Sequence, residues 1–431
     1  MLNRKIISLL CAASIVTLTC SCGKSNDNNT ESKSETITIW AFDTSASAAD
    51  KAVEIYKRNH PDTELDFNVV SYGQDDMVEK IKIALSTNST ETLPDMFYDE
   101  DYNFYEYVSY HTDLFYDVTS YISDDSFYDY KTINVTYNDR QYAIPYDSGT
   151  GVMFYRTDLI AKAGYTDEDM KDLTWSEYID IGKDVKKATG KDMLIMCPDG
   201  DMEGRLMYQS AGVWFFDENG KPNMNNPAFH DAFTTMKAAY DANIVYNASS
   251  WDDYISAISN EKMVSLIGAS WWAPIISEYT EQSGLWRVTN MPRMEGSNDY
   301  KNYSNLGGGN WFIINNQNSD NAAKFATEMF AENQELANYM ADQYLFIPVN
   351  ANLVSGLQTT ENEFFGNQNV SKLLCEYNSE IIPVKYGLNT YEMTYTVGPI
   401  AGEYLADKIT LEDAIDKMEK AAEQAANNVD Q

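Results

Sequence analysis

Hydrophobic positions near the start of the chain follow two different periods. Alternation with β-branched residues predicts strands at 36–40 (TITIW), at 63–72 (TELDFNVVSY) and, after a proline, within 93–101 (LPDMFYDED). Apolar residues at helical spacing predict helices at 45–61, which ends at a proline, and at 74–88. This β-α-β-α-β order predicts a largely parallel sheet with helices on both of its faces.

Later segments carry turn and helix-start signals. Asn138 and Asp139 predict a hairpin, and an extended strand then passes through a break at 145–151. Two pairs at helix starts place a hydroxyl three residues before a carboxylate, so that each can satisfy a free amide of the first turn. These pairs are Thr174 with Glu177, and Thr410 with Asp413 on the final helix. Trp175 is therefore expected to be a structural residue.

The N-terminus has the pattern of an export signal. Arg4 and Lys5 precede an apolar stretch at 6–18, which is shorter than the roughly 20 residues that span a bilayer. A small residue then stands before Cys22, and Cys20 is a second candidate of the same kind. We expect residues 1–21 to be a signal peptide and 22–35, which is polar and has no hydrophobic period, to be a flexible tether.

Charge and cysteine content narrow the class of protein. The 66 acidic and 31 basic residues give a net charge of −35, which argues against nucleic acid and anionic lipid as partners. At 431 residues the chain is long enough for two domains. Outside the N-terminal leader only Cys197 and Cys375 remain, as one disulfide or, as we expect, two isolated thiols.

Enzymatic motifs are mostly lacking in the sequence. It has no G-x-S-x-G, H-E-x-x-H or P-loop pattern, and its three histidines have no metal-ligand spacing. We therefore expect no cofactor and no metal. The glycines of 305–311 (NLGGGNW) lack the lysine of a phosphate loop and are expected to allow close backbone approach. A pair of carboxylates acting on a glycosidic bond stays open, because such a pair is defined by its separation in space.

Aromatic residues and carboxylates recur together at the ends of strand-like runs, where ligands bind on parallel sheets. An indole face can cover the apolar face of a sugar, and carboxylates or amides can hold its hydroxyls. For each pair, the alternative is a core aromatic residue beside a solvated acid. The pairs are Trp40 with Asp43, Tyr98 with Asp99 and Glu100, Tyr146 with Asp147, Trp271 with Trp272, and Asn310 with Trp311.

Several of these segments together resemble a known family. From residue 36 to the last helix, the chain is similar to the extracellular solute-binding proteins of bacterial ABC sugar importers, which include the maltodextrin-binding proteins. Arg156 and Ser270 depart from the usual pattern, where asparagine and proline are common. The segments that carry the resemblance are TITIWAF, LPDMFYDED, QYAIPYDSGTGVMFYRTDLIAKAG, TWSEY, AISNEKMVSLIGASWW, LGGGNWFIINNQNSDNAAKFATEMF and ITLEDAIDKMEKA. The sequence before Cys22 also resembles the lipobox of bacterial lipoproteins.

The resemblance implies an α/β fold of the periplasmic-binding-protein type II kind. It has two lobes, each a mainly parallel sheet flanked by helices, and hinge strands that join them. Carried onto this chain, the first lobe comprises 36–147 and 266–316, and the second comprises 148–265 and 317–431. The crossings between the lobes are then expected near 147–151, 263–268 and 315–319.

The resemblance also implies a ligand site between the lobes. Matched residue by residue, the ligand-binding set is Trp40, Asp43, Asp99, Glu100, Tyr146, Asp147, Trp271, Asn310 and Trp311, with Asp201, Tyr208 and Trp272 as weaker candidates. If the tryptophan doublet is extended, its side chains point to opposite faces. We then expect Trp271 to face the site, Trp272 to pack into the first lobe, and residues 268–270 to leave room for a ligand.

These implications define an expected function. The chain is expected to be a monomeric lipoprotein on the outer face of the cytoplasmic membrane, in a bacterium without an outer membrane. It would deliver an oligosaccharide to the permease subunits of an ABC transporter without making or breaking bonds. Two alternatives stay open: a receptor for a polyamine or other small solute with the same fold, and a surface glycoside hydrolase.

Overall fold

The computed structural model describes residues 35–123, 126–197 and 200–427 of the chain. Residues from Glu35 onward form one compact unit that contains two five-stranded sheets. The expected signal peptide, the tether up to residue 34, and the cysteines Cys11, Cys20 and Cys22 lie outside the described residues.

The first sheet has the strand order β2-β1-β3-β12-β6. Strand β1 pairs in parallel with β2 and β3, as the β-α-β-α-β pattern predicts, but β12 is antiparallel to both β3 and β6. The sheet is therefore mixed. Its strands are β1 (Thr36–Phe42), β2 (Asp66–Tyr72), β3 (Met96–Glu100), β6 (Ala143–Pro145) and β12 (Gly309–Ile313).

The second sheet has the order β11-β7-β10-β8-β9. Strand β7 is antiparallel to β10 and β11, while β10, β8 and β9 are parallel to one another. This sheet is also mixed, and its strands β7 and β10 are buried along their whole length. Its strands are β7 (Gly151–Arg156), β8 (Asp192–Met196), β9 (Val245–Asn247), β10 (Met263–Ala269) and β11 (Trp286–Asn290).

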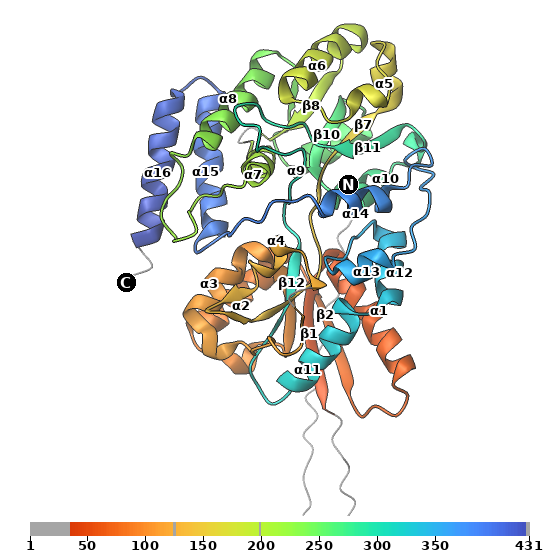
Figure 1. The fold of residues 1–431 in the computed structure, drawn as a ribbon, viewed down its shortest axis with the longest axis vertical. Coiled ribbons are helices and arrows are strands. Elements are labelled where there is room, and N and C mark those ends of the chain that lie inside the picture. The colour runs from red at the N-terminus through yellow and green to blue at the C-terminus, as the bar shows by residue number, and fades with distance from the viewer. Residues whose placement is uncertain (1–34, 124–125, 198–199, 428–431) are drawn as a thin grey trace, which may run out of the picture. The chain divides into compact units, whose positions relative to one another are not determined.

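Helices cover both sheets (Figure 1). Apolar side chains of α1 and α11 pack with the first sheet, and those of α6, α8 and α16 pack with the second. The α-helices are α1 (Asp43–Asn59), α2 (Gln74–Ser86), α3 (Phe104–His111), α4 (Asp129–Thr132), α5 (Thr157–Lys162), α6 (Trp175–Thr189), α7 (Asp201–Ser210), α8 (Pro227–Asp241), α9 (Trp251–Ser259), α10 (Trp272–Ser277), α11 (Ser319–Ala326), α12 (Gln334–Tyr344), α13 (Ala351–Ser355), α14 (Val370–Asn378), α15 (Thr390–Leu405) and α16 (Leu411–Asn427).

Local signals in the sequence predict several of these boundaries correctly. The hairpin of β4 (Thr136–Tyr137) and β5 (Arg140–Gln141) turns through Asn138 and Asp139, both with positive φ, as its two-residue loop requires. Thr174 and Glu177 form the expected reciprocal cap at the start of α6, where Trp175 is buried. In the second pair, the Thr410 hydroxyl donates to the Asp413 carboxylate at the start of α16.

The expected division into lobes is wrong in its later segments. Strands β10 and β11, assigned above to the first lobe, belong to the second sheet because both pair with β7. Helix α11, assigned to the second lobe, packs its buried residues in the core of the first sheet, as does Phe330. The expected crossings at 263–268 and 315–319 are therefore not crossings. Later in the chain, Phe365 and Leu374 pack with β7 and β11 residues.

Two segments connect the sheets side by side. Residues 146–150 lead from β6 to β7, as expected, and residues 291–308 lead back from β11 to β12. The amide of Gly151 donates to Ser304 O (2.7 Å), and that of Leu306 donates to Gly149 O (2.8 Å). A Cβ atom on Gly149 would lie 1.9 Å from Leu306 O, so this close approach requires glycine. Below, 147–151 and 304–309 are called the crossing segments.

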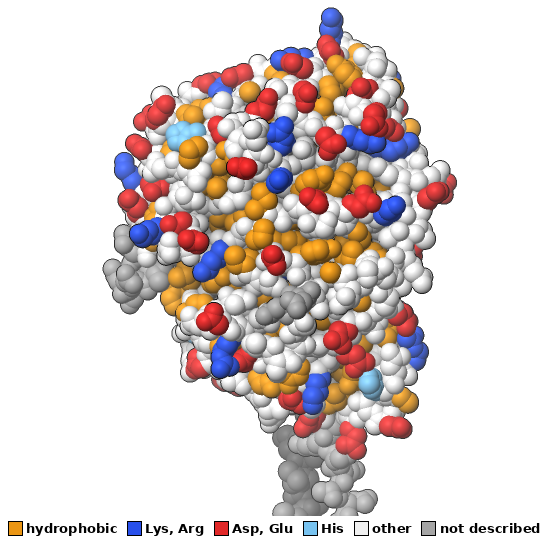
Figure 2. All heavy atoms as spheres, in the orientation of Figure 1, with side chains coloured by type: hydrophobic (Ala, Val, Ile, Leu, Met, Phe, Trp, Pro, Cys, Tyr) orange, Lys and Arg blue, Asp and Glu red, His pale blue; other side chains and the backbone are white. Residues whose placement is uncertain are grey.

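Hydrophobic side chains on the face shown in Figure 2 gather in a band across its middle, while acidic and basic side chains are interspersed over the rest. None of the helices in the described ranges is both long enough and apolar enough to cross a membrane.

Candidate functional site

The first sheet presents aromatic and acidic side chains at the carboxyl ends of its parallel strands. Trp40 near the end of β1 packs edge-on against Tyr72 at the end of β2, with ring centroids 5.0 Å apart. Glu100 ends β3 and is partly exposed, while Asp43 begins α1 and is exposed. Because β1, β2 and β3 are parallel, these side chains belong to one edge of the sheet.

The second sheet also presents aromatic and charged side chains at the carboxyl ends of its parallel strands. Trp271 follows β10 and is partly exposed, and Asp201 begins α7 after β8. Asp201 forms an ion pair with Arg205 one turn later on α7 (Nη2–Oδ2 2.6 Å). Trp251 begins α9 after β9 and is 49% exposed. Aromatic and charged groups therefore lie at the carboxyl edge of this sheet as well.

One crossing segment brings these two edges together. The indole N–H of Trp271 donates to Leu306 O (3.4 Å), and the amide of Gly307 donates to the hydroxyl of Tyr102 (3.1 Å). A Cβ on Gly307 would lie 3.3 Å from Oε1 of Glu100. The guanidinium carbon of Arg205 lies 5.5 Å from the centroid of the Tyr102 ring. Groups from both sheets thus surround residues 306–307, and we take this as the candidate site.

Burial gives the site an unusual electrostatic character. It raises the pKa of Glu100 to about 7, and neighbouring Asp99 raises it further while Arg205 lowers it. Burial acts to lower the pKa of Arg205, but the charges of Asp201, Tyr102 and Glu100 together act in the opposite direction, and the pKa is raised. The site therefore holds a fixed cation beside a carboxyl group that titrates near neutral pH.

A buried polar network lies beneath the carboxyl edge of the first sheet. It contains Asp99 and Asn310, two of the expected ligand residues. Lys131 pairs with Asp101 (Nζ–Oδ1 2.5 Å), and the Asn310 amide donates to the same oxygen (2.7 Å). Asp99 accepts from the Tyr107 hydroxyl (2.7 Å) and is fully buried. The pKa of Asp99 rises to about 6 because it is buried. Asn310 and Asp99 are both fully buried, and their hydrogen bonds run to groups inside the protein rather than to a ligand, although Oδ1 of Asn310 has no partner among the described residues.

Three further expected residues also point into the protein. Trp311 is fully buried and stacks on Phe330, with ring centroids 4.2 Å apart. Tyr146 is buried against the same phenyl ring (5.1 Å). Tyr208 is buried against Phe229 (4.5 Å) in the core of the second sheet. Helices cover both faces of each sheet, so even side chains near a strand end lie in a core, and these residues cannot be exposed stacking platforms.

Asp147 lies in the first crossing segment and ties it to the first sheet. Its Oδ1 accepts from the Tyr98 hydroxyl (2.8 Å) and from the amide of Gly309 (2.6 Å). Burial raises its pKa, and Lys131 lowers it. Asp147 is therefore placed beside the candidate site, but its hydrogen bonds fix the backbone of the crossing segments.

The tryptophan doublet lies at a strand-to-helix turn. Trp272 begins α10 and is fully buried, with its ring stacked on Tyr254 (5.6 Å) in the second-sheet cluster rather than in the first lobe. A Cβ on Gly268 would lie 2.6 Å from Cδ1 of Trp272, so the space beside this glycine is filled by the indole and not by a ligand. Trp271 is the more exposed of the two, as expected.

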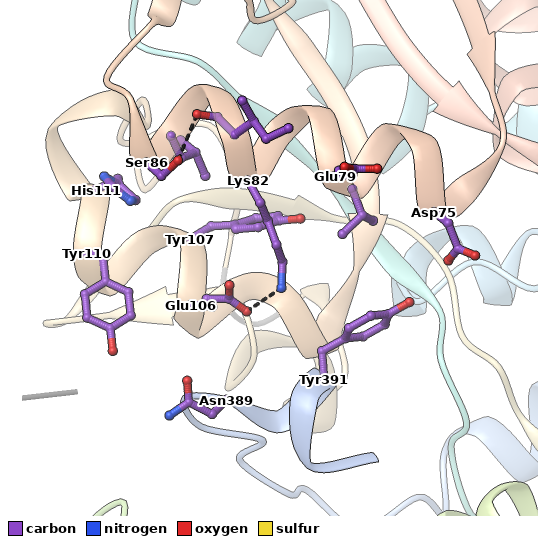
Figure 3. Close-up of a pocket in the computed structure, with 13 residues that line it drawn as sticks. Asp75, Glu79, Lys82, Ser86, Glu106, Tyr107, Tyr110, His111, Asn389 and Tyr391 are labelled. Carbon is purple, nitrogen blue, oxygen red and sulfur yellow. Dashed lines mark hydrogen bonds and ion pairs between the residues drawn. The ribbon is translucent and has the colours of Figure 1, made fainter. Parts of the chain in front are cut away.

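A groove of about 550 Å³ opens between α2, α3 and the start of α15 (Figure 3). Lys82 donates to Glu106 (2.9 Å), and its ammonium lies 5.5 Å from the centroid of the Tyr391 ring. Burial raises the pKa of Tyr391, and the hydrogen bond with Tyr395 and the charge of Glu100 add to the effect. Tyr391, Arg205 and Trp251 are not among the site residues predicted from the sequence. Trp251 could have been found, since Ser250 before it is a residue type that caps helix starts and the short strand β9 ends three residues before Ser250.

The described part of the chain contains no group of three or more His, Cys, Asp or Glu residues that could hold a metal ion. Cys197 and Cys375 are free thiols, so the disulfide alternative is not realised.

Two mixed α/β sheets joined by paired crossing segments, with a polar and aromatic site at the junction, define the class of two-lobed solute receptors. The chain belongs to the bacterial extracellular solute-binding protein family, whose model matches residues 51–365. This family consists of receptors and not of enzymes, which removes the alternative of a glycoside hydrolase.

Relatives of known description agree with this assignment. The lactose-binding protein of Rhizobium radiobacter is 31% identical over 375 residues, which cover 84% of this chain and 86% of the relative. The arabinooligosaccharide-binding protein of Bacillus subtilis strain 168 is 28% identical over 193 residues, 44% of each chain. The solved structure of the sugar-binding protein MalE from Xanthomonas citri superimposes with a TM-score of 0.75 at 13% identity, covering 91% of this chain and 98% of MalE. The expected fold class is thereby confirmed.

Proposed function

We propose that this protein is an extracellular receptor for a carbohydrate, in particular an oligosaccharide. The observation that carries the proposal is the grouping of Trp271, Glu100 and Arg205 around residues 306–307 of the crossing segment, with the Trp40–Tyr72 pair at the same sheet edge as Glu100. Indole faces suit the C–H face of a sugar ring, and the charged groups suit its hydroxyls. The named ligands of the two curated relatives, lactose and arabino-oligosaccharides, support this class.

The proposed ligand residues are those that reach this junction. They comprise Trp40, Asp43, Glu100 and Trp271 of the expected set, with Asp201 as the partner of Arg205. Arg205 joins them from the geometry of the site, and we add Tyr391 because the charge of Glu100 contributes to raising the pKa of its hydroxyl. In this proposal a ligand that contacts both sheets favours the arrangement in which they are closest, by its differential affinity for that state.

Binding is tested by isothermal titration calorimetry and melting temperature across lactose, arabino-oligosaccharides, malto-oligosaccharides and spermidine. Spermidine tests the polyamine alternative, which the fixed charge of Arg205 disfavours. Stacking on an aromatic ring contributes roughly 1–3 kcal/mol, by analogy with bases, so Trp271→Ala should weaken sugar binding by about one to two decades. A panel in which no sugar binds, or in which only spermidine binds, would overturn the proposal.

A matched control distinguishes the loss of ring stacking on the sugar from a general loss of folding. Tyr339 is a partly exposed aromatic residue on α12, packed beside Lys51 and away from the crossing segments. Tyr339→Ala should leave sugar affinity unchanged, because its ring contacts Lys51 and Tyr344 and not the residues around 306–307. An equal loss of affinity in both variants would mean that the effect is not specific to Trp271.

The proposal extends to delivery and anchoring. We propose that the loaded receptor passes its sugar to the permease of an ABC transporter, and that lipid on Cys22 holds it at the outer face of the membrane, with Cys20 as the alternative. The lipobox-like sequence supports this step. Expressed in a Gram-positive host, Cys22→Ala should release the protein into the medium, while Cys20→Ala should not. Release by Cys20→Ala alone would assign the lipid to that residue instead.

A further inference from the structure

Trp251 is a half-exposed tryptophan next to the candidate site. One face of its indole stacks on Trp272, with ring centroids 4.7 Å apart and the planes 24° apart, yet the residue is 49% exposed. Its ring centroid lies 6.2 Å from that of Trp271. The stack therefore continues from the interior through Trp272 to two indoles that reach the surface.

The topology of the second sheet explains how these rings come together. Strands β10, β8 and β9 are parallel neighbours in that order, so their carboxyl ends meet at one edge. Trp271 follows β10, the Asp201–Arg205 pair follows β8, and Trp251 follows β9. Trp251 thus occupies the outer end of the row of loops whose inner members belong to the candidate site.

Local structure does not require a tryptophan at this position. Ser250 caps α9 by accepting a hydrogen bond from the amide of Asp253, and Trp251 follows as the first helical residue. A side chain here projects from the first turn, where many residue types are accepted. Together with Trp271, the Trp251 ring forms a continuous aromatic surface beside the candidate site, which points to a ligand that covers it.

We propose that Trp251 is an outer stacking platform and that the ligand is an oligosaccharide of more than two sugar rings. This inference rests on the proposed function. The rings nearest the crossing segment lie by Trp271, and a third ring covers the open face of Trp251. The 6.2 Å between the two indole centroids suits successive rings of one chain, rather than one ring held by both.

The test compares ligand lengths within one series. Calorimetry is run with lactose and a galactosyl-lactose trisaccharide, arabinobiose and arabinotriose, and maltose and maltotriose, on the wild type, Trp251→Ala and Trp271→Ala. Trp251→Ala should weaken binding of the trisaccharide of the bound series about tenfold or more and leave the disaccharide within about twofold. Trp271→Ala should weaken both.

Trp251 also covers Trp272, so the loss of a ligand contact must be distinguished from a loss of stability. Trp251→Phe keeps an aromatic face and should recover most of the trisaccharide affinity. Equal loss for both lengths, no loss for either, or a wild type that binds both lengths equally would overturn this inference while sugar binding itself stands. A wild type that binds none of these sugars would instead overturn the proposed function.

Discussion

Removal of Lys131 should destabilise the protein in a pH-dependent way. The Lys131 and Asp101 side chains are both completely buried and lie 2.5 Å apart. Lys131→Met keeps most of the apolar stem of the side chain and removes its charge, which leaves the carboxylate of Asp101 without its cation. Loss of one partner of a buried pair costs about 3–5 kcal/mol of unfolding free energy.

The pH dependence follows from the pKa of Asp101. Burial raises it from 3.8 to about 7, and Lys131 acts in the opposite direction, so the variant raises it further. A folded pKa above the unfolded value means that the folded state binds the proton more tightly. The stabilisation of the folded state by this proton is complete at low pH and is lost as pH rises through the folded pKa. At pH 8 the full loss of about 3–5 kcal/mol is therefore expected, and at pH 5 less than half of it, because Asp101 is then protonated.

Urea denaturation followed by tryptophan fluorescence at the two pH values measures this difference. Lys171→Met is the matched control, since Lys171 pairs with Glu168 at the surface and should change stability by less than about 1 kcal/mol at either pH. The double variant Asp101→Asn/Lys131→Met should recover much of the loss. Equal destabilisation at pH 8 and pH 5 would refute the assignment of the effect to the charge of Asp101.

Three further changes test other parts of the fold. Gly149→Ala should cost about 1–3 kcal/mol or more, because its Cβ would lie 1.9 Å from Leu306 O and would separate the crossing segments; unchanged melting would contradict this contact. Trp311→Ala should cost about 3–5 kcal/mol in denaturant unfolding, as expected for a core ring, whereas a loss of sugar affinity without a loss of stability would restore it to the site. Thr174→Ala should cost about 1 kcal/mol by removal of the α6 cap, with Thr174→Ser as the control that keeps it.

Features set by neighbouring residues could be predicted from the sequence. The cap at Thr174, the hairpin at Asn138 and Asp139, and the first strands and helices each depend on a few consecutive side chains and on backbone preferences. The close approach at the glycines of 305–311 was also predicted correctly, because a glycine run without a phosphate-loop lysine has few other uses.

Features set by distant partners could not be predicted in this way. Whether β10 and β11 join the first or the second sheet depends on their pairing with β7, more than a hundred residues earlier in the chain. Asp99 and Asn310 are surface-type residues by composition, and only the fold places Tyr107 and Asp101 beside them. Aromatic and acidic pairs at strand ends therefore include residues of buried networks as well as residues of an open site. The sequence pattern alone does not distinguish the two.

The tryptophan doublet shows which local assumption fails. Alternation assigns opposite faces to Trp271 and Trp272 only if both are extended, but β10 ends at Ala269 and α10 begins at Trp272. Pro274 in the following turn was the available signal, since proline is accepted in the first turn of a helix and is excluded from a central strand. The two indoles stack on each other with centroids 5.0 Å apart instead of pointing away from each other. Trp272 thus supports Trp271 from behind, and a substitution at Trp272 should reduce both stability and affinity.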